Sequence, residues 1–270
     1  MKRILCVVIA AFLLLSPIGI GVYAENVCED CEGGEFSIAA GKPVASNEIS
    51  NARVEFFFDV TAKNLKLSDP AKAKIKLMLK LDGDAGRYLP ELVTKLKEDR
   101  EIYTFSPTLA VSQLYKTPNV RASAALVVDD KVICETEVVQ VSVKISEPKI
   151  RLGNVGMLKL KEKFKYAANF EIAPDAKLEN LKFKFSLNMT LPRKDGQKEL
   201  QIIKIIENQV FNISDLPDPA IFEKDFEFPA EYNNIKGRSI ATIITVYDIS
   251  PVEEGVIPYR EGIYMSMMTR

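Results

Sequence analysis

The chain has 270 residues, of which 47% are apolar or aromatic and 27% are charged, and its formal net charge is −1. This is the composition of an ordinary folded protein. The sequence contains no histidine, which excludes hydrolases that use a histidine base and metal or haem sites built on histidine ligands. The charge lacks the positive excess of a nucleic-acid-binding protein, so no nucleic-acid partner is predicted.

Residues 1–24 are predicted to be a secretory signal peptide. Lys2 and Arg3 form a positive start, Ile4–Leu15 is an uninterrupted apolar run, and Val22-Tyr23-Ala24 fits a cleavage site. An apolar helix of this length would span about 18 Å, which is short of the ~30 Å hydrocarbon core of a bilayer. We therefore expect no transmembrane span after cleavage, and a secreted, periplasmic or cell-surface location.

The segment at residues 25–34 is predicted to be an acidic leader that holds Cys28 and Cys31. A local disulfide between these two cysteines is the simplest interpretation, although so small a ring adds little stability. Cys134 brings the exported chain to an odd number of cysteines, so at least one thiol lacks an intramolecular partner. Intermolecular bridging, metal binding, thiol exchange and a bond from Cys134 to the leader remain alternatives. No cofactor and no metal site are predicted.

Most of the remaining chain has the hydrophobic period of β-strands. Residues 54–60, 74–81 and 181–191 alternate apolar with polar side chains, as strands with one buried and one solvated face do. Such half-solvated strands are typical of antiparallel sheets. The lysines that alternate with the apolar residues are interpreted as the solvated faces. Cys134 alternates in step with its apolar neighbours and is interpreted as a small core residue.

One segment has a helical spacing instead. Leu89, Leu92, Val93 and Leu96 recur at the interval that places side chains on one helix face. A proline precedes Leu92 where the first turn of a helix tolerates it. We therefore predict one short helix over residues 90–100.

The sequence contains an internal repeat. Residues 132–143 align with 256–267 with four identities in twelve positions, and residues 121–128 align with 238–245. The same order of segments at a similar spacing indicates a duplicated unit. The second copy is longer between its two segments, and the insertion falls at residues 248–255.

Each copy has the size and strand pattern of a small β-sandwich. The predicted fold class is all-β: two tandem antiparallel sandwiches, at residues 35–146 and 147–270, with the one short helix in the first. Their architecture resembles immunoglobulin-like and fibronectin-III-like sandwiches, without the Cys…Trp…Cys signature of antibody domains. Residues 262–269 are predicted to be the last strand of the second sandwich, and the alternative is an apolar tail donated to another subunit.

No phosphate-binding loop, nucleophile motif or carboxylate pair stands in a convincing setting, so we predict a protein that is not an enzyme. The expected function is an exported binding or structural protein for adhesion, scaffolding or envelope assembly, with a protein or cell-surface partner. One alternative is a strand-exchanging chaperone or pilus-like subunit, and another is a thiol-redox or metal-binding protein that uses Cys28 and Cys31. Contacts are expected at the loops 129–131 and 248–255 and at the cysteine leader. Individual binding residues and the oligomeric state remain unknown.

Overall fold

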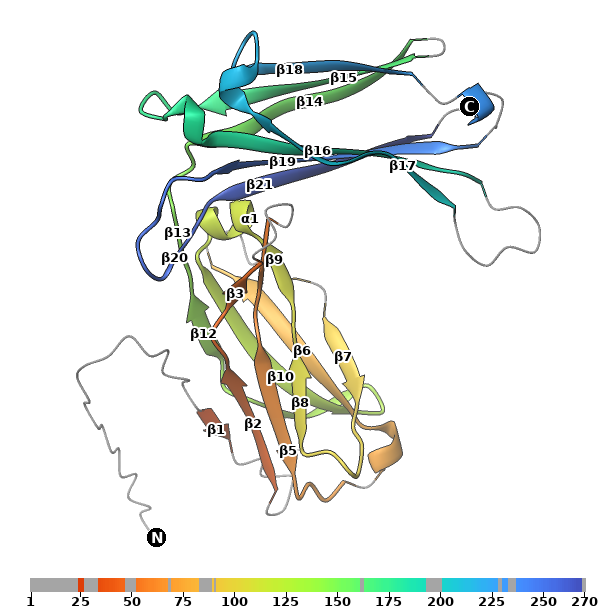
Figure 1. The fold of residues 1–270 in the computed structure, drawn as a ribbon. Helices are drawn as coiled ribbons and strands as arrows, with labels where there is room; N and C mark the ends of the chain where they lie inside the picture. Colours follow the sequence, from red (N-terminus) through yellow and green to blue (C-terminus); the bar gives the residue numbers. More distant parts are fainter. Residues whose placement is uncertain are drawn as a thin grey trace, which may run out of the picture.

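In a computed structural model, the described residues are 24–26, 34–46, 52–67, 69–82, 89, 91–160, 163–192, 201–227, 230–232 and 237–268. They form two antiparallel β-sandwiches with one α-helix, and the second sandwich lies across one end of the first (Figure 1). The predicted all-β class is therefore confirmed. No helix in the described ranges is long and apolar enough to cross a membrane. Apart from its last residue, the predicted signal peptide lies outside the described residues.

The first sandwich contains two main sheets. One has the order β1-β2-β5-β8, from β1 (Ala24–Asn26), β2 (Glu35–Ala40), β5 (Phe58–Lys63) and β8 (Ile102–Phe105). The other has the order β11-β10-β6-β7, with β12 also paired to β10, from β6 (Lys74–Leu81), β7 (Leu92–Lys95), β10 (Asn119–Val128), β11 (Lys131–Glu135) and β12 (Val139–Ser142). The 3-10 turn η1 (Pro70–Lys72) precedes β6.

The end of the first sandwich that faces the second has its own small elements. A three-stranded sheet has the order β3-β4-β9, from β3 (Val44–Ala45), β4 (Arg53–Glu55) and β9 (Thr108–Ala110). The helix α1 (Val111–Lys116) follows β9 directly and lies under the second sandwich in Figure 1. Val111 and Leu114, one helical turn apart, are both buried in the first core.

The helix predicted at residues 90–100 is wrong. This segment contains β7, an edge strand that pairs with β6 from Lys74↔Lys95 to Leu77↔Leu92. Leu92 is half-buried and Val93 is exposed, which is the period of a strand. The backbone pairing with β6 outweighs the helical spacing of four apolar residues, because local propensity is weak against tertiary context. Among the described residues of the first sandwich, the α-helix is α1.

The second sandwich is built in the same way. One sheet has the order β14-β15-β18, from β14 (Ile150–Leu160), β15 (Lys163–Ile172) and β18 (Ile221–Glu227). The facing sheet has the order β17-β16-β19-β21, from β16 (Leu181–Thr190), β17 (Ile202–Asn212), β19 (Ser239–Asp248) and β21 (Arg260–Met268). The 3-10 turns are η2 (Leu178–Asn180), η3 (Ile213–Asp215) and η4 (Ala230–Tyr232).

The strand order reproduces the repeat in the sequence. In the first sandwich β10 lies between β6 and β12, and in the second β19 lies between β16 and β21. Each sandwich has its own core of buried side chains. The second core is rich in phenylalanine, and the ring centroids of Phe183 and Phe222 are 4.7 Å apart. β21 pairs within its own sheet, so the structure contains the predicted last strand and not a donated tail.

Candidate functional site

The junction between the two sandwiches concentrates specific contacts. A two-stranded parallel sheet joins β13 (Lys144–Ile145), at the end of the first sandwich, to β20 (Val256–Ile257), in the loop between β19 and β21. The amide of Ser146 donates to the carbonyl of Ile257 at 2.9 Å. The Ser146 hydroxyl accepts from the amide of Tyr259, also at 2.9 Å. The insertion predicted from the repeat thus runs along the connection between the sandwiches.

Tyr259 belongs to the second sequence repeat but lies in the first core. Its side chain is 6% exposed and is part of the first hydrophobic cluster. Its ring meets the ring of Tyr115, on α1, edge to face at 5.6 Å. The guanidinium of Arg151, on β14, lies 5.5 Å from the centre of the Tyr115 ring. Burial raises the pKa of the Tyr259 phenol, so the ring is neutral at physiological pH.

The two charged residues at the start of β21 also form hydrogen bonds at the junction. Arg260 donates to the backbone carbonyl of Ser46 at 2.8 Å, and burial lowers the pKa of its guanidinium. A carboxylate oxygen of Glu261 accepts from the amide of Leu152 at 2.9 Å and from the Tyr259 hydroxyl at 3.2 Å. These charge-assisted hydrogen bonds connect the first two residues of β21 to both sandwiches.

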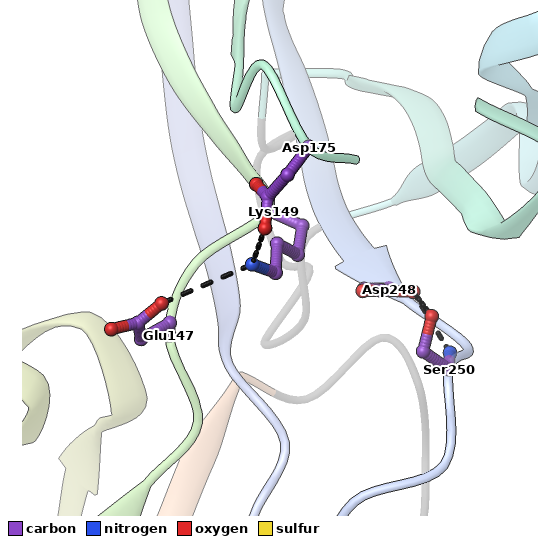
Figure 2. A network of polar contacts seen from close by, with 5 residues as sticks. All are labelled: Glu147, Lys149, Asp175, Asp248 and Ser250. Atoms are coloured by element: carbon purple, nitrogen blue, oxygen red, sulfur yellow. Dashed lines mark hydrogen bonds and ion pairs between the residues drawn. The ribbon is translucent and has the colours of Figure 1, made fainter. Parts of the chain in front are cut away.

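A partly exposed polar network surrounds the connection between the sandwiches (Figure 2). The Lys149 ammonium lies 2.6 Å from the carboxylate of Asp175 and 3.9 Å from that of Glu147. The hydrogen bond to Asp175 raises the pKa of Lys149, and the same bond lowers the pKa of Asp175. Asp248 accepts from the hydroxyl and the amide of Ser250, which fixes the start of the long loop.

A shallow groove lies on the outer face of the first sandwich. It encloses about 660 Å³ and is lined by Met78, Leu79, Lys80, Arg121, Ala122, Ser123, Glu135, Val138 and Gln140. The groove lies where the chain passes from β11 to β12, which pair with successive parts of β10. Arg121 is 3.1 Å from Asp82, and Val138 is 61% exposed. The groove surface mixes apolar side chains with charges of both signs.

The two loops predicted as contact sites lie in different parts of the structure. Asp129 and Asp130 form the turn between β10 and β11 with φ of 50° and 60°, the backbone of a tight two-residue hairpin turn. Asp129 makes an exposed ion pair with Lys72 at 3.2 Å. Loop 248–255 instead belongs to the junction, where Glu253 pairs with Lys144 at 2.8 Å. The sequence insertion signalled this loop, but nothing in the sequence indicated that Tyr259 enters the first core.

Of the four cysteines, only Cys134 lies within the described residues. Cys134 lies on β11 opposite Leu126, is 8% exposed and is not a free thiol. It is therefore a buried residue of the first core, as its alternation indicated. Cys28 and Cys31, the predicted disulfide pair, lie outside the described residues. Within the described residues no group of three or more cysteine, aspartate and glutamate side chains could hold a metal ion.

No family model and no curated protein matches the chain. Among solved structures, the chain is similar to trypsin-activated alpha-2-macroglobulin from Escherichia coli, with 13% identity over 79% of this chain but only 14% of that one, and a TM-score of 0.32. The chain is also similar to a DUF3823 family protein from Bacteroides ovatus, with 13% identity over 63% of this chain and 80% of that one, and a TM-score of 0.24. Its similarity to the human OSCAR ligand-binding domain has 11% identity over 84% of this chain and 99% of that one, and a TM-score of 0.22.

Proposed function

We propose that the protein is an exported, non-enzymatic structural or binding protein of the cell surface or periplasm. In this proposal its two sandwiches form one rigid unit that presents its outer surfaces to a protein or cell-surface partner. The observation that carries the proposal is the burial of Tyr259 in the core of the other sandwich. Neighbouring domains of one chain usually move relative to one another unless their interface is large and apolar.

The polar contacts of the junction support the same proposal. Arg260, Glu261 and Lys149 hold the two sandwiches and their connection in place. A fixed angle between two sandwiches is useful to a scaffold or adhesion protein, because it holds the two ends at a constant distance and orientation. The groove beside Val138 offers such a protein a surface that mixes apolar side chains with charges.

The test begins with native protein isolated from its own cells without reductant. Its mass is measured under native conditions, and the chains that migrate with it are identified after chemical cross-linking. We expect a species larger than the single mature chain, which persists in the double variant Cys28→Ser/Cys31→Ser. A lone monomer with thiol-exchange activity that the double variant loses would overturn the proposal in favour of the redox alternative.

A further inference from the structure

The outer edge of β21 has no protection against pairing with another strand. On its inner side β21 pairs with β19 from Tyr247↔Arg260 to Ser239↔Met268. Within the described residues, no strand pairs with its other side. Residues 262–268 read Gly-Ile-Tyr-Met-Ser-Met-Met, with neither charge nor proline. Exposed edges usually carry charges, prolines or bulges that prevent association with a further strand.

The other edges of the second sandwich do carry such features. β17, at the opposite end of the same sheet, contains Lys204 and Glu207, and its pairing with β16 is interrupted near Asn208, which has a positive φ of 53°. β18, at an edge of the facing sheet, carries Glu223, Lys224 and Asp225 in succession. β14, the other edge of the facing sheet, is neutral from Leu152 to Leu158, but its pairing is interrupted between Leu152 and Val155. β21 therefore differs from these three edges because its neutral run has neither a charge nor an interruption.

The outward face of β21 is strongly apolar. Tyr264 is 65% exposed and Met268 is 75% exposed, the two largest values among the big apolar side chains of the described residues. Alternate strand residues share a face, so both side chains project from the same side. Ile243 of β19, the cross-strand neighbour of Tyr264, is also exposed. These three exposed apolar side chains share one face of the sheet close to its edge.

The inward face of β21 is incompletely covered. Its apolar residues Ile263, Met265 and Met267 are only half-buried. In the first sandwich β12 takes the equivalent place, and its inward residues Val139 and Val141 are 1% and 9% exposed. Each strand touches its facing sheet, β12 at β2 and β21 at β14, so the difference lies in how far the inward side chains are covered. The edge beside β21 thus leaves apolar surface open on both faces of one strand.

We propose that a second copy of this chain pairs with β21 through its own β21, antiparallel, and joins the two four-stranded sheets into one. This inference rests on the proposed function and names the partner. The strand that fits this edge is neutral and apolar on both faces, and β21 is itself such a strand. Two-fold antiparallel pairing centred near Met265 keeps the two copies of Glu261 at opposite ends, roughly 27 Å apart at ~3.4 Å per residue. The two copies of Glu261 therefore do not meet.

The junction leaves this edge free to pair. The charged side chains of Arg260 and Glu261 are held by Ser46, Leu152 and Tyr259, so they do not project over the neutral part of the strand. Figure 1 shows β21 starting above α1 and running away from the first sandwich. The neutral residues lie in the part of the strand that extends beyond this contact.

The experiment is sedimentation velocity of the full mature protein over a wide concentration range. We expect a reversible dimer. Tyr264→Lys should weaken self-association by roughly tenfold or more, because it places a charge on the pairing edge and removes apolar contact. The matched control is Val210→Lys, an exposed apolar position on β17 at the other edge of the same sheet, which should leave the dimer intact. Circular dichroism melting checks that both variants fold.

Each outcome decides the inference. A wild-type protein that stays monomeric throughout the range overturns it, and so does equal weakening by the two lysine variants. A monomer that still recovers a different chain in the native isolation overturns pairing with a second copy but leaves the proposed function standing. A dimer that depends on Tyr264, in a protein with thiol-exchange activity, would support the pairing while the proposed function fails.

Discussion

The ring of Tyr259 packs edge-on against the ring of Tyr115, with centroids 5.6 Å apart and ring planes at 81°. Tyr115 belongs to the helix of the first sandwich, and Tyr259 leads into the last strand of the second. The contact therefore makes part of the second repeat a structural component of the first core. The stability of the first sandwich should depend on a residue of the second.

Replacement of Tyr259 by alanine should be strongly destabilising. Loss of a large buried aromatic side chain costs about 3–5 kcal/mol in the free energy of unfolding. We expect urea unfolding at a lower midpoint, with the transition divided into two steps as the sandwiches uncouple. Tyr264→Ala is the control, because that ring is exposed and its loss should change stability by less than about 0.5 kcal/mol. Equal effects of the two substitutions would contradict the assigned role of Tyr259.

The ion pair between Lys149 and Asp175 should make stability depend on acid pH. The folded pKa of Asp175 is lowered by its hydrogen bond to Lys149, so its contribution is present above the ordinary aspartate pKa and is lost as pH falls through the lowered value. Asp175→Asn should therefore flatten the acid side of the stability profile. Urea midpoints measured from neutral to acid pH test this.

The same ion pair should also make the free energy of unfolding depend on alkaline pH. The bond to Asp175 raises the pKa of Lys149, so this contribution is present below the ordinary lysine pKa and is lost as pH rises through the raised value. Asp175 is exposed and Lys149 is half-buried, and solvent screening keeps the effect small. Lys149→Met should reduce the alkaline dependence of the unfolding midpoint, compared with the wild type at equal ionic strength, and other lysines with a raised pKa, such as Lys72 and Lys163, keep the remainder. An alkaline dependence in this variant as steep as that of the wild type would contradict the assignment.

The turn between β10 and β11 offers a stabilising substitution. Asp130 has a φ of 60°, a conformation that glycine adopts without the steric cost of a Cβ atom. Asp130→Gly should keep or raise the free energy of unfolding, by up to about 1 kcal/mol, while Asp130→Val should lower it by about 1–2 kcal/mol. Thermal melting of the two variants gives the comparison. The reverse order of stabilities would contradict the turn geometry.

Cys134 should resist alkylation in the unreduced native protein. The residue is buried and is not a free thiol. We expect labelling of Cys134 only after reduction, and a disulfide-linked peptide that joins it to Cys28 or Cys31 in a mass-spectrometric digest. Such a result would displace the local Cys28–Cys31 bond as the simplest interpretation of the leader. Alkylation of Cys134 without reduction, in a protein that retains a Cys28–Cys31 bond, would contradict the prediction.

The fold class could be predicted from the sequence because its main strands are strongly periodic. Ile75, Leu77 and Leu79 alternate with lysines, and each of the three is buried in the structure. The prediction for the segment around Leu92 is wrong because its four apolar residues fit a helix face. Its strand conformation depends on pairing with β6, which the local sequence does not show. The helix α1 was missed because it has only six residues, too few for a clear period.

The junction could be predicted only in part. The alignment of the two repeats located the long loop of the second copy, because an insertion changes the offset between matching segments. It could not reveal that this loop pairs with β13, or that Tyr259 enters the first core. These contacts depend on the angle between the sandwiches, which no local pattern encodes. The edge of β21 was visible as a neutral run, but its half-buried inner face appears only in comparison with β12.

The most direct test of the central claim is small-angle X-ray scattering from the wild-type protein and the Tyr259→Ala variant. Data are collected at low concentration, where a single chain is measured. If the junction holds the sandwiches as one rigid unit, a single arrangement fits the wild-type curve, and the variant shows a larger radius of gyration that needs an ensemble. A wild-type curve that already needs an ensemble, and that the substitution leaves unchanged, would contradict the account.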